Sequence, residues 1–358
     1  MKDITVVIGN YNYARFLREA IESALANVQM NARPGSDECV RVLVIDDGST
    51  DDSRTIIESF GERVTPVFKE NQGQSSVYNL GLALVQTEYV LFLDSDDILY
   101  PDACGEVLRA FGSGNYAKVQ FRLDVISEEG VRTGVRVPHS TPPSDCAALL
   151  RRGWLYPSPP ASGNAYRVSA LRSVFPIPMS WQHRKAADFF AIYGIALTGA
   201  ICALDSTLGG YRVHRKAEDK RGDSIGQAGL SLGNCEDVSE VERSFPWRWE
   251  TLRHMIRTRL GEDLPAHFID FSYEKNRLCV RLYEASTVER WRWLMFESRR
   301  YFASLVGNPY WSAGKKAGAL GLTLMCLIPS RQINHFALRY ISNPAARFAM
   351  RGSVAARG

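Results

Sequence analysis

The sequence predicts an α/β fold with a parallel sheet. Short runs of β-branched and other apolar residues, which are typical of buried strands, occupy residues 4–8, 40–45, 65–68 and 89–93. Segments with apolar residues at helical spacing separate these runs. This alternation of strands with helices indicates parallel pairing through right-handed crossovers.

The connecting helices have signals of their own. The helix expected at 15–26 carries apolar residues three and four positions apart. A second helix is expected to end at Phe60 and to start after Ser49, whose side chain would form a capping box with the Asp three residues later. Residues 75–85 predict a third helix, and Pro101 is expected at the first position of a fourth.

Composition excludes several classes of protein. The chain has 358 residues, of which 45% are hydrophobic and 23% charged, so collagen-like, coiled-coil and wholly disordered chains are excluded. The seven cysteines are odd in number and include no CxxC pair, so we expect reduced thiols in the cytosol rather than a disulfide framework or a zinc site. The apolar run at the N-terminus is too short for a signal peptide, and the longest run, 317–328, is shorter than the roughly 20 residues of a membrane span.

Polar residues directly follow three of the predicted strands. They are Asn10, the pair Asp46-Asp47, and the Asp-Ser-Asp-Asp run at 94–97. In open α/β sheets the ligand binds in the crevice beyond the carboxyl ends of the strands. We therefore expect these three groups to converge on one cleft.

The chemistry of this cleft points to a phosphate-bearing ligand held through a metal ion. The residues after the first strand, 9–13, match neither the dinucleotide-binding fingerprint nor the P-loop. Carboxylates repel phosphates unless a divalent cation lies between them, and Asp94 and Asp96 supply two hard oxygen ligands for Mg²⁺ or Mn²⁺. Asp-rich turns also cap helices, which is the role expected for Asp51 and Asp52.

Four motifs, taken in order, resemble those of family 2 glycosyltransferases, which have the GT-A fold. They are Val6-Val7-Ile8-Gly9-Asn10-Tyr11-Asn12, then Val44-Ile45-Asp46-Asp47-Gly48-Ser49-Thr50-Asp51, then Asn71-Gln72-Gly73, then Leu93-Asp94-Ser95-Asp96-Asp97. The resemblance covers roughly residues 3–215. Gly9 stands where the family usually has proline, which affects the turn and not the chemistry.

The resemblance implies roles for the polar groups at the strand ends. Asp94 and Asp96 would be the DxD motif, which holds the metal, Mg²⁺ or Mn²⁺, and contacts the ribose and diphosphate of a nucleotide-sugar donor. Asp47, or its neighbour Asp46, would hydrogen-bond the base of the donor, usually uracil. The nucleotide-sugar-binding residues implied in this way are Asn10, Tyr11, Asp46, Asp47, Gln74, Asp94, Ser95 and Asp96.

An inverting transferase also needs a base, because the acceptor hydroxyl must lose its proton as it attacks the sugar. The family places this base about ninety residues past the DxD motif, at the start of an apolar helix. The matching residue is Asp188, which follows Ala187 where the family often has Glu. The alternative for Asp188 is an ordinary N-cap.

Other implied site residues lie on the acceptor side and at the end of the domain. A stretch similar to a family segment beside the acceptor contains Gly163, whose missing side chain would let the backbone approach a sugar, and Asn164. Trp181 could stack on a sugar or lie in the core. Arg212 and His214 match the family's YRxH element, so either could meet the diphosphate or the metal, with a structural role as the alternative.

The resemblance therefore implies an inverting, metal-dependent glycosyltransferase. It would move a sugar from a nucleotide-diphospho-sugar, usually a UDP-sugar, to a saccharide or lipid-linked saccharide in cell-surface polysaccharide biosynthesis. The QxxRW motif of processive synthases is missing, so a single addition is expected. The alternatives are a nucleotidyltransferase and an inactive, membrane-recruited protein that binds nucleotide sugars.

Three parts are expected along the chain. They are a GT-A catalytic domain at 1–225, a linker or mobile loop at 226–245, and a basic helical region at 246–358. Apolar spacing predicts helices of this last region at 247–260, 270–284, 288–306, 317–328 and 333–341.

The formal net charge of +4 hides two opposite halves. Residues 241–358 have a net charge of +10 and residues 1–240 have −6, and beyond Glu297 there are nine basic residues and no acidic one. Basic amphipathic helices with aromatic residues fit an anionic membrane surface, and the apolar run among them argues against nucleic acid. The part 298–358 is therefore expected to hold a cytoplasmic enzyme on the inner face of the cell membrane. A helical subdomain packed on the catalytic domain is the alternative.

Overall fold

The structure is a computed structural model of the whole chain. It describes residues 2–31, 38–142, 145–179, 184–214 and 238–342. The chain forms two compact units. The first unit comprises Met1–Arg212 and Glu250–Ala266, and the second comprises Val213–Trp249 and His267–Gly358.

The first unit is built on a mixed, mostly parallel sheet. Within the described residues its nine strands have the order β3-β2-β1-β4-β8-β6-β9-β5, and β7 pairs with β6. These strands are β1 (Lys2–Asn10), β2 (Glu38–Asp46), β3 (Thr65–Phe68), β4 (Tyr89–Asp94), β5 (Ile98–Leu99), β6 (Tyr116–Ile126), β7 (Arg132–Val137), β8 (Asn164–Arg167) and β9 (Ala200–Arg212).

The four strands predicted from the sequence form one parallel part of this sheet, and β6 and β9 form another. Strand β1 pairs in parallel with β2 and β4, and β2 pairs with β3. In this register Asn10 lies opposite Asp46, and Gly9 lies opposite Asp94. The polar residues that end β1, β2 and β4 therefore meet at one edge of the sheet, as expected. The predicted α/β fold is confirmed.

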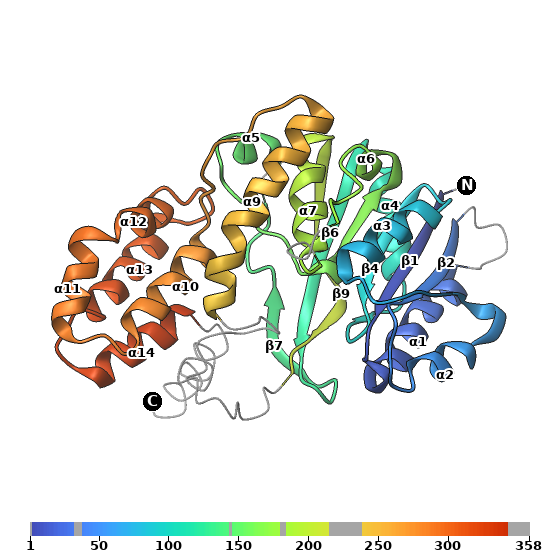
Figure 1. Cartoon of the computed structure of the whole chain (residues 1–358), viewed down its shortest axis with the longest axis horizontal. Helices are drawn as coiled ribbons and strands as arrows, with labels where there is room; N and C mark the ends of the chain where they lie inside the picture. Colours follow the sequence, from blue (N-terminus) through green and yellow to red (C-terminus); the bar gives the residue numbers. More distant parts are fainter. Residues whose placement is uncertain (1, 32–37, 143–144, 180–183, 215–237, 343–358) are drawn as a thin grey trace. The chain divides into compact units, whose positions relative to one another are not determined.

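Helices flank both faces of this sheet (Figure 1). The helices of the first unit are α1 (Ala14–Asn31), α2 (Ser53–Glu58), α3 (Gln74–Leu84), α4 (Ala103–Gly112), α5 (Cys146–Arg151), α6 (Val168–Arg172) and α7 (Ala187–Gly194), with short 3₁₀ turns at Gly61–Arg63, Ala161–Gly163 and Ile195–Leu197. Val6 and Ile8 of β1 are buried in one core with Leu17 of α1. Val7 faces the other side, where a Cβ added at Gly81 of α3 would lie 2.9 Å from its side chain.

The expected capping box at the second helix is wrong. Its N-cap residue is Asp52, which makes no side-chain capping bond. The Ser49 hydroxyl is used elsewhere, because it donates to Asp46 and accepts from the backbone N–H of Asn12 at 2.9 Å. Ser49 therefore stabilises the turn after β2 and not the helix that follows.

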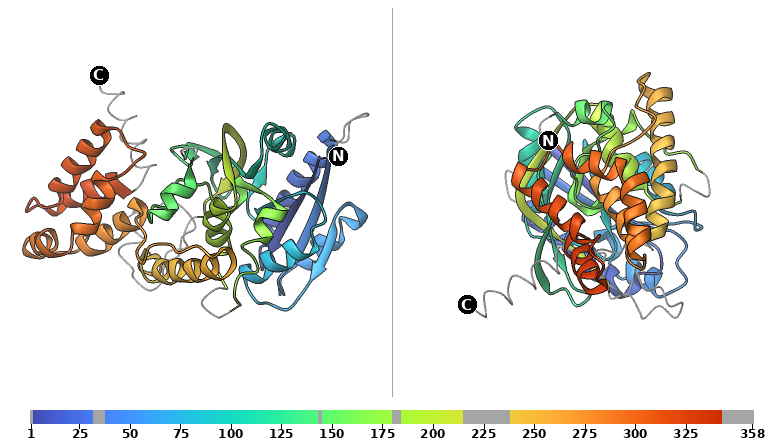
Figure 2. Two further views of the ribbon diagram at one scale, coloured as in Figure 1. Left: turned by 90° about the horizontal axis from the view of Figure 1, so that it is seen from above. Right: turned by 90° about the vertical axis from the view of Figure 1, so that its left-hand side faces the viewer.

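The second unit is helical, and Figure 2 shows its orange to red helices packed side by side. Its helices are α10 (Phe271–Leu282), α11 (Thr287–Phe296), α12 (Arg299–Val306), α13 (Ala313–Met325) and α14 (Arg331–Ser342), and α9 (Val238–Leu260) runs from this unit into the first. A separate core contains Leu278, Trp293, Tyr301 and Leu338. No helix in the described ranges is both long and apolar enough to cross a membrane.

Three helix boundaries differ from the expected ones. The helix expected at 288–306 is broken into α11 and α12, because the Ser298 hydroxyl donates to the Leu294 carbonyl at 2.6 Å and competes with helical pairing. Pro101 precedes α4 by two residues, since Asp102 adopts a left-handed φ of 65°. Helix α9 begins at Val238 and contains Pro246, so part of the segment expected as a linker is helical.

Candidate functional site

A carboxylate loop follows strand β4 at the polar edge of the sheet. Here this loop means Asp94, Ser95, Asp96 and Asp97. Ser95 and Asp97 are buried, whereas Asp94 and Asp96 are partly exposed. The backbone N–H of Asp97 donates to the Asp94 carbonyl at 3.0 Å, which closes the loop into a tight turn.

Negative charge is concentrated in this loop. Burial and the charges of Asp96 and Asp188 raise the pKa of Asp94 to about 8, against a lowering hydrogen bond from Gln74. Burial and the charges of Asp96 and Asp94 raise the pKa of Asp97 well above its usual value. The loop thus holds carboxylates that repel one another, which is the electrostatic situation a bound cation relieves.

The buried carboxylate of Asp97 holds the carboxylate loop in place. Its carboxylate accepts hydrogen bonds from the Ser162 hydroxyl at 2.6 Å and from the backbone N–H of Arg212 at 2.8 Å. Ser162 also accepts from the backbone N–H of Asp94 at 3.1 Å. Ser162 therefore holds the backbone of Asp94 and the carboxylate of Asp97 at once, a role that no pattern of neighbouring residues indicates.

Arg212 supports the same loop through its guanidinium group, which is buried. The Nε donates to the Asp96 carbonyl at 2.7 Å, and one terminal nitrogen pairs with Glu19 at 2.6 Å. The other terminal nitrogen donates to the carbonyls of Ser127 and Glu128. These bonds hold the Arg212 guanidinium against backbone carbonyls and Glu19. This arrangement does not favour the expected contact of Arg212 with a diphosphate, which stays a prediction.

Asp188 lies in the first turn of α7, near the carboxylate loop. Its charge raises the pKa of Asp94, so the two carboxylates are within electrostatic range. The N-cap of α7 is Ala186, so the alternative role of Asp188 as an N-cap is wrong. Ala186 has a left-handed φ of 86°, which is rare for a residue with a side chain and marks a constrained entry to the helix.

Gln74 links these two parts of the site. Its side-chain oxygen accepts hydrogen bonds from the backbone N–H groups of Ala186 and Ala187, both at 3.1 Å. Its side chain also lies close enough to Asp94 to lower the pKa of that carboxyl. A single side chain thus bonds the start of the helix that carries Asp188 and lies beside the carboxylate loop.

Gly73, the residue before Gln74, allows the two segments to come together. Its φ is 89°, and a Cβ added there would lie 2.5 Å from the Arg184 carbonyl oxygen. The Arg184 side chain in turn donates to the Asn71 carbonyl at 2.8 Å. The Asn71-Gln72-Gly73 motif therefore packs directly on the segment that leads into α7.

Two buried tyrosines lie beside the carboxylates. Burial and the charge of Asp94 raise the pKa of Tyr78 well above its usual value, and Asp188 contributes to the same shift. For Tyr166 the causes of the raised pKa are burial, then Asp188, then Asp94. Tyr78 is fixed by stacking on Phe92, with ring centroids 3.8 Å apart. Both tyrosines thus lie within electrostatic range of Asp94 and Asp188.

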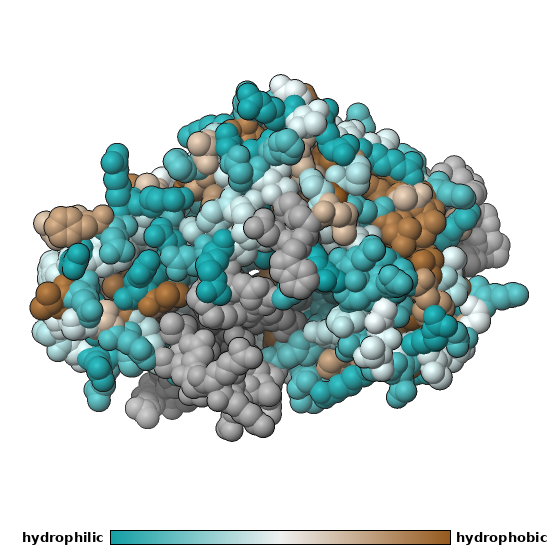
Figure 3. Space-filling model, in the orientation of Figure 1, coloured by the Kyte–Doolittle hydropathy of each residue, from teal (hydrophilic) through white to brown (hydrophobic). Residues whose placement is uncertain are grey.

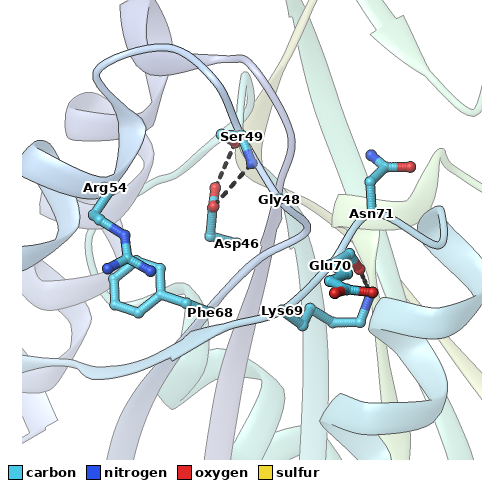
Figure 4. A pocket seen from close by; sticks show the side chains of 8 residues that line it. All are labelled: Asp46, Gly48, Ser49, Arg54, Phe68, Lys69, Glu70 and Asn71. Carbon is cyan, nitrogen blue, oxygen red and sulfur yellow. Dashed lines mark hydrogen bonds between the residues drawn. The ribbon is translucent and has the colours of Figure 1, made fainter.

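An open pocket of about 520 Å³ lies beyond the ends of β2 and β3 (Figure 4). Its lining residues are Asp46, Gly48, Ser49, Arg54, Phe68, Lys69, Glu70 and Asn71. Asp46 is tied to Ser49 at the back of the pocket. Arg54 lies over the Phe68 ring, with 4.2 Å between its guanidinium carbon and the ring centroid. The pocket thus combines charged, polar and aromatic groups at the polar edge of the sheet.

Asp47 has a different environment from Asp46. Its carboxylate pairs with Lys69 and accepts from the backbone N–H groups of Gln72 at 3.0 Å and Gly73 at 2.7 Å. It therefore organises the 69–73 segment. Asp46 is the member of the pair that lines the pocket.

Asn10 and Tyr11 differ in their accessibility. Asn10 is 2% exposed and donates to Asp46 at 2.8 Å. Its side-chain oxygen is buried and has no hydrogen-bond partner, which is a costly state for a polar atom. Tyr11 is 47% exposed. The roles of both in nucleotide binding stay predictions.

The residues expected on the acceptor side serve the protein's own packing where they are described. A Cβ added at Gly163 would lie 2.6 Å from Pro159, so an internal contact is enough to require this glycine, and its expected approach to a sugar stays a prediction. The Asn164 side chain donates to the carbonyls of Pro159, Pro160 and Ala161. Trp181 lies outside the described residues. His214 belongs to the second unit, and its role stays a prediction.

The donor atoms in the loop fit a divalent cation that is shared with a ligand. Over the described ranges, no group of three or more His, Cys, Asp or Glu side chains is arranged to hold a metal by itself. Mg²⁺ is commonly bound by one or two carboxylates together with substrate phosphates. Asp94 and Asp96 supply such carboxylates, and their mutual repulsion favours a cation between them.

Comparison with known proteins agrees with this arrangement. Residues 5–175 match the family model of Glycosyl transferase family 2. This part of the chain belongs to that family. It contains the carboxylate loop, Gln74 and the open pocket, whereas Asp188 follows the matched residues.

Relatives of this family 2 domain include uncharacterized glycosyltransferases. One from Nostoc sp. (strain PCC 7120) is 35% identical over 222 residues, which cover 59% of this chain and 65% of that protein. One from Rickettsia prowazekii is 35% identical over 99 residues, 28% of this chain and 29% of that protein. The chain thus spans less than two thirds of the length of either relative.

A solved structure shows the same fold. S. aureus TarS 1-349 in complex with UDP-GlcNAc has a TM-score of 0.50 and 17% identity, and the match covers 96% of this chain and 90% of that one. The family 2 domain therefore has the GT-A fold of such glycosyltransferases.

Proposed function

We propose that this protein is an inverting, metal-dependent and non-processive glycosyltransferase that uses a nucleotide-diphospho-sugar. One observation carries the proposal: Asp188 and Asp94 lie within electrostatic range at the carboxyl edge of the sheet, and Gln74, which lies beside Asp94, bonds the segment that carries Asp188. One carboxylate group is thus available for the donor and another for the acceptor. This is the arrangement that a single displacement at a sugar carbon requires.

Asp188 acts as the general base in this proposal. The acceptor hydroxyl attacks the anomeric carbon from the face opposite the diphosphate and gives its proton to the Asp188 carboxylate. The bond from the anomeric carbon to the diphosphate oxygen breaks as the bond to the acceptor oxygen forms. The nucleoside diphosphate leaves with the electron pair, so the configuration at the anomeric carbon is inverted.

Asp94 and Asp96 would hold Mg²⁺ or Mn²⁺, which supplies charge neutralisation for the leaving diphosphate. Ser162, Asp97 and Arg212 keep the backbone of the carboxylate loop in place without contacting the donor. Because these supports are buried and hydrogen-bonded, the carboxylates need little reorganisation when the donor arrives.

The open pocket receives the nucleoside end of the donor in this proposal. Asp46 lines it, and the buried Asn10 holds Asp46 in place by donating to its carboxylate at 2.8 Å. The TarS structure with UDP-GlcNAc suggests a UDP-sugar as the first donor to examine. A saccharide or lipid-linked saccharide of cell-surface polysaccharide synthesis is the proposed acceptor.

A donor panel tests the proposal on the full-length chain. UDP-, GDP- and dTDP-sugars are each added with Mn²⁺ or with EDTA, and both thermal stabilisation and slow release of nucleoside diphosphate are measured. We expect one nucleotide class to stabilise the protein only with Mn²⁺. Asp96→Asn should lose this stabilisation, whereas Asp188→Asn should keep it and lose diphosphate release.

Asp205→Asn is the matched control, since the Asp205 side chain is 84% exposed on β9 and away from the carboxylate loop. It should behave as the wild type in both assays. Release of pyrophosphate when a nucleoside triphosphate and a sugar 1-phosphate replace the nucleotide sugar would indicate a nucleotidyltransferase instead. Absence of stabilisation by any nucleotide sugar would contradict the proposal.

A further inference from the structure

Exposed apolar side chains are concentrated in the second unit. Among the described residues, 14 large hydrophobic side chains are exposed, and nine of them lie between Val288 and Phe336. Single exposed apolar residues are ordinary, but a concentration of this kind marks an interaction surface. The helices α11 to α14 carry this surface.

Helix α11 has an exposed apolar strip. Val288, Trp291 and Met295 are 78%, 51% and 72% exposed, and their spacing of three and four residues places them on one side of the helix. Phe296, at 77%, extends the strip at its end. On the opposite side of α11, Trp293 packs in the core of the second unit.

Helix α13 and the turn that follows it have a second strip. Leu320, Leu324 and Ile328, spaced four residues apart, are 37%, 50% and 40% exposed. Cys326 lies in the core of the unit, and Leu322 packs against that core. The helix is therefore apolar both toward the core and away from it, which is not expected of a helix with a solvated outer face.

Arg290 connects the two strips. This buried arginine of α11 donates to the carbonyls of Cys326 at 3.4 Å and Ile328 at 3.2 Å. The start of the α11 strip and the end of the α13 strip therefore belong to neighbouring parts of the unit. Figure 3 shows brown side chains between teal ones over this group of helices.

The charges around the strips are mostly positive, although Glu289 and Glu297 lie beside the α11 strip. No Asp or Glu occurs after Glu297. The basic residues of α12, α13 and α14 are Arg299, Arg300, Lys315, Lys316, Arg331 and Arg339. A surface with exposed apolar and aromatic side chains among basic ones complements the headgroups and the outer acyl region of an anionic bilayer.

We propose that the α11 and α13 strips together form a docking surface for an anionic lipid membrane, on its cytoplasmic leaflet. Helix α13 has 13 residues, fewer than the roughly 20 needed to cross a bilayer, so it would lie in the interface. This partner is additional to the proposed transfer reaction and does not depend on it. It would bring the enzyme to the surface at which a lipid-linked acceptor is exposed.

Vesicle binding tests this proposal with the full-length chain. Sedimentation is measured with vesicles of phosphatidylcholine alone and of phosphatidylcholine with phosphatidylglycerol, at low and at high salt. We expect binding to the anionic vesicles only, weakened by salt because charge attracts the basic residues. Absence of binding to anionic vesicles, or equal binding to both kinds, would overturn the proposal.

Two matched pairs of variants identify the surface. Val288→Glu and Leu324→Glu should each weaken vesicle binding about 10-fold or more, because a charge replaces an inserted apolar side chain. Val131→Glu and Leu84→Glu, at exposed positions of the first unit, should bind as the wild type does. Equal loss in both members of a pair would overturn the assignment of the surface.

Folding of the variants and self-association of the chain are measured separately. Mn²⁺-dependent stabilisation by the nucleotide sugar should be unchanged in Val288→Glu, which shows that this variant is folded and that docking is independent of the transfer site. Light scattering with size-exclusion chromatography measures self-association. A wild-type dimer that becomes monomeric in Leu324→Glu would overturn the proposal and assign the strips to a second copy of the chain.

Discussion

The side-chain oxygen of Gln74 lies 3.1 Å from the backbone nitrogen of Ala187, the residue before Asp188. Gln74 begins helix α3 and Ala187 begins α7, so this bond joins the starts of two helices that are 113 residues apart in the sequence. The same side chain lies close enough to Asp94 to lower the pKa of that carboxyl. The segment that carries the proposed base is thus fixed beside the carboxylate loop.

We expect Gln74→Ala to lower the rate of sugar transfer more than it weakens donor binding. The substitution removes both bonds to the start of α7, so Asp188 loses its fixed position relative to the acceptor. A displacement of this kind can reduce turnover about 10- to 100-fold. Steady-state kinetics measure it as a fall in kcat with a nearly unchanged KM for the donor.

Gln72→Ala is the matched control for this prediction. Gln72 is exposed, and its side chain accepts a hydrogen bond from Ser76 at 3.2 Å, whereas the bond to Asp47 is made by its backbone. We expect wild-type kinetics for this variant. A normal kcat in Gln74→Ala would show that α7 keeps its position without the bridge.

Asp94→Asn should separate stability from activity. Burial and the charges of Asp96 and Asp188 raise the pKa of Asp94, so removing its charge should leave the metal-free protein at least as stable as the wild type. Activity should fall by about 100-fold or more, because one carboxylate of the proposed metal site is lost. Urea unfolding in EDTA and a transfer assay with Mn²⁺ measure the two effects.

Ser162→Ala should destabilise the first unit by about 1–3 kcal/mol, since the buried Asp97 carboxylate loses a hydrogen bond. The backbone N–H of Asp94 loses its acceptor at the same time. The free energy of unfolding from urea titration checks this. The control is Ser59→Ala, at an exposed hydroxyl that donates to the Ile56 carbonyl, and it should change stability by less than about 0.5 kcal/mol.

The lowered pKa of Lys118 predicts how the free energy of unfolding varies with pH. This lysine of β6 is fully buried, with its Nζ donating to the Ser158 hydroxyl at 3.0 Å, and burial lowers its pKa from 10.5 to about 7. Between these two values the unfolded chain binds a proton that the folded chain does not. The contribution of Lys118 to stability is therefore complete above pH 10.5 and is lost as the pH falls toward 7.

We expect Lys118→Met to flatten this dependence. In the wild type, Lys118 adds at most about 1.4 kcal/mol per pH unit to the slope of the free energy of unfolding between about pH 7 and 10. The variant should lack this slope and be at least as stable as the wild type at neutral pH. Lys185→Met, at an exposed position, should keep the slope. Parallel profiles of Lys118→Met and the wild type would contradict the prediction.

Periodicity accounts for how much of the fold was predictable. The buried strands β1, β2 and β4 consist of apolar runs, β3 is short and partly exposed, and the alternation of these strands with helices determines parallel pairing, so local pattern and global topology agree. The strands from β5 to β9 were not predicted. Strand β8 has four residues and β5 has two, and segments of this length carry no periodic signal.

The site was predictable to the extent that it follows directly from strand ends. The Asp-Ser-Asp-Asp run appears in the sequence at the end of β4, because a ligand crevice of an α/β sheet forms where parallel strands end. Gln74 was expected to bind the nucleotide sugar, and its bonds to Ala186 and Ala187 were not foreseen. Likewise, Gly163 was expected to face a sugar, but its missing side chain is explained by Pro159.

The sequence by itself determined strands β1 to β4, the carboxylate loop and the contrast between an acidic first part and a basic last part, because these features depend on residues adjacent in the chain. Only the tertiary structure decided that Ser162 would support Asp97, and that Gln74 would bond the start of the helix of Asp188. The first of these contacts connects residues 65 positions apart, and the second spans 113. Hydrogen bonds between such distant residues depend on how helices and strands pack, and no local pattern of residues encodes that packing.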